Sequence, residues 1–151
     1  MTAASPPALA MIQFASPEWV AALKAILVEL VEEAQPDLAG VDFTICEVFT
    51  DVPPDRGVCV WAARITGDGV QFFDEAVEGD FEVKGDYEAI LPGARIIYEG
   101  VTEAQLAVQA EHRRRMVAAG RLQAKGDMRG VPRRLRLLLQ TMHDRLARQT
   151  L

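Results

Sequence analysis

The chain is poor in the residues that most nucleophilic and metal sites require. Among its 151 residues are two serines, Ser5 and Ser16, two histidines and two cysteines. A hydrolytic nucleophile needs a base beside it, but Ser5 falls in an N-terminal stretch without periodicity, and Ser16 falls at an expected helix start. The histidines and cysteines have no His-x-x-x-His or Cys-x-x-Cys spacing. The sequence therefore predicts no catalytic nucleophile and no metal site.

Phosphate-binding glycine loops, long apolar runs and a surplus of positive charge are also missing. Neither Gly-x-Gly-x-x-Gly nor Gly-x-x-x-x-Gly-Lys-Ser/Thr occurs, so no nucleotide cofactor is predicted. The most apolar helical stretch, residues 20–31, contains Lys24 and Glu29 and is far shorter than the ~20 residues that cross a bilayer. With 16 Lys+Arg against 22 Asp+Glu, the net charge is −6. We expect neither a nucleic-acid partner nor a transmembrane segment.

Cys46 and Cys59 leave two interpretations open. A hairpin with its turn near Pro53 would bring the two thiols side by side for disulfide or redox chemistry. Two cysteines are too few for a disulfide framework, however, and no basic segment followed by a long apolar one opens the chain. We therefore expect a cytoplasmic protein in which both reduced thiols behave as small apolar side chains.

Charge is distributed unevenly along the chain. Residues 1–100 carry 5 basic and 18 acidic side chains, whereas residues 101–151 carry 11 basic and 4 acidic ones. The simpler interpretation is a solvated basic face that pairs with the acidic part of the chain. The alternative is a basic frame around a cavity mouth, which attracts a carboxylate, a phosphate or an anionic membrane and gives this third of the chain a weak contact with anionic surfaces. The arginines concerned are Arg113, Arg114, Arg115, Arg121, Arg133 and Arg134.

Secondary structure is expected to begin after a flexible arm, residues 1–15. Ser16 can cap a helix and Pro17 suits its first position; apolar residues then recur at three- and four-residue spacing until Pro36. After Gly40 the period changes to two, which predicts three consecutive antiparallel strands.

The three strands are bounded by turn residues. The first strand places Phe43, Ile45 and Phe49 on one side. A turn at residues 53–57 leads to a second strand at 58–65, and Gly67-Asp68-Gly69 forms a hairpin to the third. A fourth strand is expected at residues 80–84, before a short helix that Asp86 caps and Pro92-Gly93 ends.

The last third of the chain predicts two helices with a strand between them. Thr102 and Gln105 match a capping box, and residues 121–127 alternate as a fifth strand. Pro132 starts a final helix. Its apolar stripe comprises Leu135, Leu138, Leu139, Met142 and Leu146.

These elements predict an α+β fold in which helices cover one face of a five-stranded, mainly antiparallel sheet. Residues 16–151 are expected to form a single domain, because a chain of this length buries roughly 68–70% of its unfolded surface around one core.

Four stretches resemble the sterol-carrier-protein-like family of small α+β lipid-binding domains. They are FASPEW at residues 14–19, GDGV at 67–70, KGDY at 84–87 and GRLQAKGD at 120–127. The resemblance implies a hydrophobic tunnel between sheet and helices that accepts an acyl chain, a sterol or another apolar ligand, without a catalytic residue or a cofactor.

The residues that line such a tunnel are expected among the inward-facing apolar side chains, which in a domain without a tunnel would fill a solid core. We expect ligand contacts from Trp19, Leu23, Phe43, Trp61, Phe72, Tyr87, Ile90, Met116 and Leu122.

Glu47 is the one carboxylate that strand alternation places among aromatic residues. It either extends to solvent, pairs with Arg64 across the hairpin, or lies in a pocket as a ligand-orienting group. His112 is expected on a solvated helix face and His143 at the edge of the last helix.

The predicted function is non-catalytic binding or carriage of a hydrophobic small molecule or lipid, of fatty-acyl, isoprenoid or sterol-like type. One alternative is a small enzyme that uses Glu47, Asp86 or His112 as an acid or base in the same cavity. Another is an accessory subunit that presents a lipid substrate to a partner enzyme.

Overall fold

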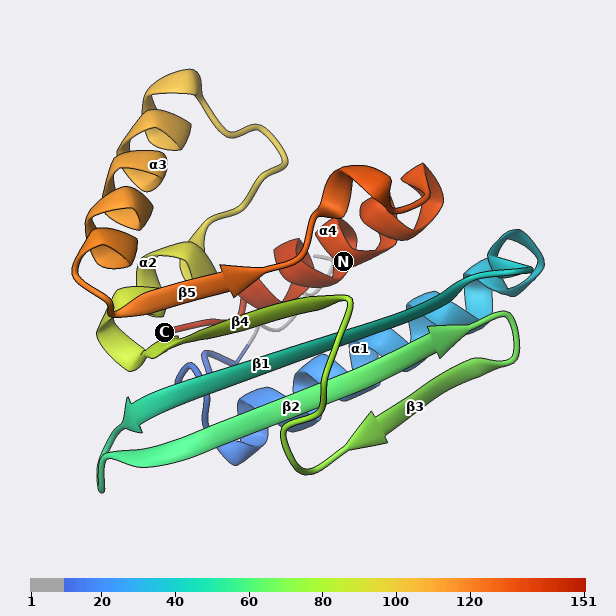
Figure 1. Ribbon diagram of the computed structural model, residues 1–151, viewed down its shortest axis with the longest axis horizontal. Helices are drawn as coiled ribbons and strands as arrows, with labels where there is room; N and C mark the ends of the chain where they lie inside the picture. Colours follow the sequence, from blue (N-terminus) through green and yellow to red (C-terminus); the bar gives the residue numbers. More distant parts are fainter. Residues whose placement is uncertain (1–9) are drawn as a thin grey trace, which may run out of the picture.

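The computed structural model describes residues 10–151 and shows one five-stranded sheet with helices on one of its faces (Figure 1). The strands lie in the order β3-β2-β1-β4-β5. Helices α1 and α4 lie behind the sheet in this view, α2 follows the end of β4, and α3 stands beside β5. The elements are α1 (Pro17–Ala34), the 3-10 turn η1 (Gln35–Leu38), β1 (Asp42–Val52), β2 (Gly57–Thr66), β3 (Gly69–Phe73), β4 (Phe81–Asp86), α2 (Tyr87–Arg95), α3 (Glu103–Ala118), β5 (Leu122–Lys125), the 3-10 turn η2 (Met128–Gly130) and α4 (Arg133–Ala147).

Helix α1 forms where the sequence predicts it, because its cap and its apolar spacing agree. The Ser16 hydroxyl accepts the backbone N–H of Trp19 at 3.2 Å. Pro17 occupies the first turn, where its missing N–H breaks no helical hydrogen bond. Leu23 and Leu27 are at most 1% exposed in the core.

The three-stranded antiparallel meander is also confirmed. In the β1–β2 register, Phe43 lies opposite Ile65 and Glu47 lies opposite Trp61. These side chains share the inner face of the sheet, where Phe43, Ile65 and Trp61 are buried.

The connection from β3 to β4 makes the sheet mixed. Residues 74–80 cross in front of β2 and β1, on the face opposite α1 (Figure 1). The Asp80 backbone N–H donates to the Thr44 carbonyl at 2.8 Å, and the Asp80 carboxylate accepts from the Thr44 N–H at 2.8 Å. β4 therefore enters beside β1 and runs parallel to it, with Phe81 beside Ile45. The other three strand pairs of the described chain are antiparallel.

Helix α2 continues past the expected stop at Pro92-Gly93 and ends at Arg95. Pro92 removes a single helical hydrogen bond, to the carbonyl of Glu88, and Glu88 is exposed to solvent. Gly93 has a packing role instead, because a Cβ there would lie 2.8 Å from the Gln109 Nε2 atom of α3. The end of the flexible Gln109 side chain packs against this glycine.

The expected flexible arm is wrong for residues 12–15, which pack against the domain, whereas residues 1–9 lie outside the described chain. The Ile12 N–H donates to the Gln149 carbonyl at 2.6 Å, and the Leu151 N–H donates to the Ile12 carbonyl at 2.9 Å. Phe14 is 1% exposed. Its burial among aromatic side chains fixes a segment whose sequence has no periodicity.

The two C-terminal helices differ in how deeply they pack. All five residues of the predicted α4 stripe are buried. Helix α3 has the predicted capping box, in which the Gln105 N–H donates to the Thr102 hydroxyl at 3.1 Å and the Gln105 side chain accepts from the Thr102 N–H at 2.9 Å. None of the α3 side chains is fully buried.

Candidate functional site

A cavity of ≈ 200 Å³ lies between the inner face of the sheet and the helices. β1, β4 and β5 form its floor, and α2, α3, α4 and the loop at residue 98 surround it. Eleven wall residues are apolar: Phe14, Trp19, Phe49, Phe81, Val83, Ala89, Ile90, Gly93, Ala94, Leu122 and Leu146. Six are polar: Glu47, Tyr98, Gln109, His112, Arg113 and His143.

A cluster of aromatic rings in edge and tilted contact lies at the cavity wall. The Phe14 ring centroid lies 4.9 Å from those of Trp19 and Phe49, and 5.4 Å from that of Tyr87. These distances are typical of favourable edge and offset contacts. Phe14 therefore occupies space between the layers that a longer cavity would otherwise include.

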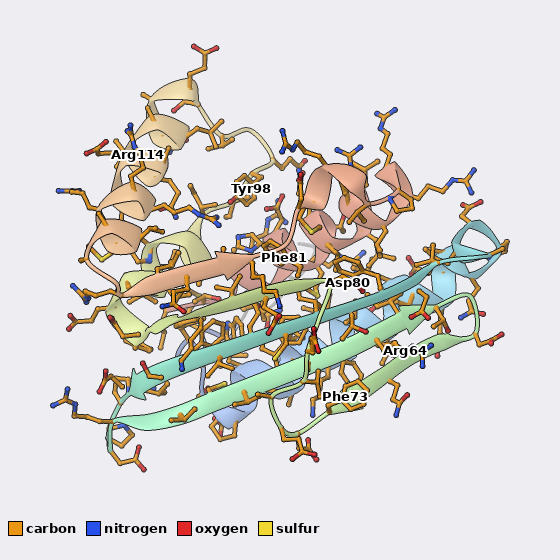
Figure 2. All side chains as sticks on the ribbon, in the orientation of Figure 1. Arg64, Phe73, Asp80, Phe81, Tyr98 and Arg114 are labelled. Atoms are coloured by element: carbon orange, nitrogen blue, oxygen red, sulfur yellow. The ribbon has the colours of Figure 1, made fainter. Side chains whose placement is uncertain are left out.

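Glu47 is the acidic residue of the cavity wall. It projects from the inner face of β1, and its accessible surface faces the cavity. Burial raises its pKa to about 7, and the nearby Trp61 indole acts in the opposite direction. The predicted ion pair between Glu47 and Arg64 is wrong. Arg64 lies on the outer face of the sheet (Figure 2) and pairs with Asp42 at 2.7 Å. The pocket interpretation of Glu47 is the one that the geometry supports.

Trp61 lies across the strand pair from Glu47 and is completely buried. Its indole Nε1 has no hydrogen-bond partner of ordinary geometry within residues 10–151. It lies near enough to the Glu47 carboxyl to favour the charged form of that group, without reaching hydrogen-bonding geometry.

Both histidines hold helices in place around the cavity. His112 Nε2 lies 2.9 Å from the Ala89 carbonyl, and His143 Nε2 lies 3.0 Å from the Ile96 carbonyl. A carbonyl only accepts, so each Nε2 carries a hydrogen, and a neutral ring leaves Nδ1 as an acceptor. Burial lowers the pKa of His143. The expected positions, a solvated face for His112 and a helix edge for His143, are wrong, because both side chains line the cavity.

The loop that carries Tyr98 is held by a buried carboxylate. Asp144, 5% exposed, accepts from the N–H groups of Tyr98 at 2.8 Å and Glu99 at 3.1 Å. The Tyr98 ring lies 5.1 Å from that of His143 and sits between α3 and α4 (Figure 2). Asp144 is the only acidic residue of α4, which is the one sequence signal that marks it.

Several solved structures of sterol carrier proteins have a similar overall fold. Sterol carrier protein 2 matches with a TM-score of 0.47 at 13% identity, over 91% of this chain and 98% of that chain. Sterol carrier protein domain 2 of Helicoverpa armigera has a TM-score of 0.47 at 15% sequence identity, and the match covers 87% of this chain and 92% of that chain. A palmitated SCP2L2 from Aedes aegypti has a TM-score of 0.41 at 13% sequence identity, and the match covers 82% of this chain and 93% of that chain. No family model and no curated protein matches the sequence.

These matches are likenesses of overall architecture at no more than 15% identity.

Three of the nine predicted ligand contacts line the cavity: Trp19, Ile90 and Leu122. The structure does not bring the other six to its wall. Leu23, Phe43 and Trp61 are core residues at most 6% exposed. The remaining three, Phe72, Tyr87 and Met116, are partly buried elsewhere.

Ion pairing accounts for several of the arginines proposed to frame a cavity mouth. Arg121 pairs with Asp86 at 2.8 Å, Arg134 pairs with Asp37 at 3.3 Å, and Arg114 pairs with Glu111. Of the six arginines, Arg113 alone is part of the cavity wall. The interpretation as surface pairs with the acidic part of the chain is confirmed for Arg121 and Arg134.

The two thiols are free and lie on opposite faces of the sheet. In the β1–β2 register, Cys46 lies opposite Ala62, whereas Cys59 lies opposite Phe49. The disulfide interpretation is therefore wrong. None of the helices between residues 10 and 151 is long and apolar enough to span a bilayer.

Proposed function

We propose that this protein binds an apolar ligand in the cavity between its sheet and its helices, and carries it without chemical change. The observation that carries the proposal is the cavity itself, whose wall is apolar at eleven of seventeen residues. A few polar groups on a mostly apolar wall are typical of small-molecule sites. The ligand class we propose is an alkyl, fatty-acyl or isoprenoid compound.

The size of the cavity limits what it holds. At ~30 Å³ for each group the size of a water molecule, ≈ 200 Å³ accepts a short chain or one end of a longer one. About seven buried methylenes contribute on the order of 5–6 kcal/mol. Association costs of roughly 4–15 kcal/mol offset that gain. Tight binding therefore requires either a ligand that displaces part of the wall or a specific polar contact.

Native mass spectrometry of the delipidated protein with added octyl compounds tests the proposal. Ala94→Phe places a ring on a cavity-lining residue of α2, and Ala110→Phe places the same ring on an exposed residue of α3. We expect one ligand per chain in the unmodified protein and in the Ala110→Phe variant, and loss of binding in the Ala94→Phe variant. Absence of binding to the unmodified protein, or equal binding by both variants, contradicts the proposal.

A second candidate function is proton transfer on an apolar substrate. The observation that favours it is the presence of Glu47, His112 and His143 on the same cavity wall. Its test is exchange of the α-hydrogens of 2-octanone for deuterium in D₂O, followed by NMR. Faster exchange with the unmodified protein than with the Glu47→Gln variant supports an enzyme, and equal rates remove this candidate.

A further inference from the structure

Glu47 is placed where a carboxyl group is costly. It comes from the central part of β1, between β2 and β4, and its neighbours on the wall include Phe49, Phe81 and Val83. Among residues 10–151 no cation pairs with its carboxyl group, and the Trp61 indole is the one hydrogen-bonding group that interacts with it. Buried polar side chains are nearly always hydrogen-bonded, because an unpaired one costs about 1–3 kcal/mol.

The other groups that surround Glu47 do not supply a partner. His112 and His143 already use Nε2 on backbone carbonyls. Tyr98 and Arg113, the other titratable wall residues, come from the loop and from α3 on the helical side of the cavity. From β2, the Cys59 thiol has its pKa raised to about 11 by burial and by Glu47, so it is uncharged.

The Trp61 indole lies beside the Glu47 carboxyl group, within the packed core. Trp61 is directly opposite Glu47 in the strand register, and its Nε1 has no partner of ordinary hydrogen-bond geometry in the described chain. One indole N–H satisfies at most one acceptor position of a carboxyl group, so the Glu47 carboxyl keeps unused hydrogen-bonding capacity where it faces the cavity. A floor intended only for hydrocarbon needs no such group.

We propose that Glu47 anchors a hydroxyl group of an otherwise apolar ligand, so that the cavity selects an alcohol over a hydrocarbon of the same size. This proposal rests on the proposed function, since it specifies the ligand of the same cavity. The ligand hydroxyl donates to a Glu47 oxygen, and the chain of the ligand lies along the apolar wall. The contact uses hydrogen-bonding capacity of the carboxyl group that the protein itself leaves free.

The test compares octan-1-ol with nonane, which has the same number of heavy atoms but a methyl group in place of the hydroxyl. Dissociation constants are measured for the full chain, for Glu47→Leu and for Gln123→Met, a control at an exposed residue of β5 that does not line the cavity. Glu47→Gln keeps the side-chain shape and a hydrogen-bonding end. The quantity compared is the preference, the nonane constant divided by the octanol constant.

We expect Glu47→Leu to reduce the preference for octanol at least tenfold, as loss of one buried hydrogen bond predicts. Glu47→Gln should retain most of the preference, and Gln123→Met should leave it unchanged. If nonane still binds and the preference for octanol is the same in Glu47→Leu as in the unmodified protein, the inference is overturned but the proposed function stands. If nonane and octanol both fail to bind the unmodified protein, the proposed function fails as well.

Discussion

Replacing Glu47 with glutamine tests the electrostatics of the cavity floor. Burial raises the pKa of Glu47 from 4.5 to about 7. Between these two pH values the unfolded chain has released the Glu47 proton, whereas the folded protein still holds it. The folded state therefore loses stability as the pH rises from 4.5 to 7. At 1.36 kcal/mol per pKa unit, the loss amounts to about 3 kcal/mol above pH 7.

Urea denaturation of the unmodified protein and of Glu47→Gln, each measured between pH 4.5 and 8, isolates this effect. Glutamine does not titrate, and contributions of distant groups are nearly the same in both proteins. We expect the free energy of unfolding of the unmodified protein to fall by about 3 kcal/mol relative to the variant over this range. Two curves that remain parallel would refute the reasoning, because they would mean that Glu47 ionises as freely in the folded protein as in the unfolded chain.

Three further predictions follow from single contacts. Phe14→Ala is expected to lower the free energy of unfolding, measured in urea, by about 3–5 kcal/mol. It should also lengthen the cavity and so strengthen binding of dodecanol relative to octanol. An unchanged preference between the two alcohols would show that Phe14 does not limit the length of the cavity. Asp144→Asn removes the charged acceptor of the Tyr98 and Glu99 N–H groups, so amide exchange at these two residues should accelerate, and unchanged protection would show that other contacts hold the loop. Asp86→Ala removes the N-cap of α2 and should cost about 1–2 kcal/mol at pH 7. Because an arginine holds the pKa of Asp86 below its usual range, this difference should shrink as the pH falls through that lowered pKa, and a difference that is the same at pH 2 and pH 7 contradicts the assignment.

Local patterns were sufficient to predict much of the fold. Ser16 and Pro17 marked the start of α1 because capping depends on residues close in sequence. The α4 stripe was predicted by helical spacing alone, since one side of a helix that packs on a core has to be apolar. Period-two alternation likewise placed Glu47 on the inner face with Phe49.

The features that sequence reasoning missed depend on contacts between distant segments. Burial of Phe14 requires Phe49 and Tyr87 to be placed around it, and no local pattern reveals that arrangement. The parallel entry of β4 depends on the long connection that Asp80 fastens to β1. His143 lies on the cavity because its ring reaches a carbonyl of the α2–α3 loop, 47 residues away in sequence.

The predicted wall was only partly correct for a related reason. Inward-facing apolar residues fill a core and line a cavity with equal ease, and spacing does not separate the two. Trp61 is inward-facing as expected, but it lies fully within the packed core. Ile90 lines the cavity because Gly85 leaves room for it above the sheet, where a Cβ would lie 2.9 Å from the Ile90 Cδ1 atom.

The most direct test of the account is NMR detection of intermolecular NOEs between octan-1-ol and the methyl groups of the protein. We predict NOEs from the alkyl chain to Ile90, Leu122 and Leu146, which line the cavity, and none to the exposed Val58. NOEs confined to exposed methyl groups, or none at saturating ligand, would contradict the claim that an apolar ligand occupies the space between sheet and helices.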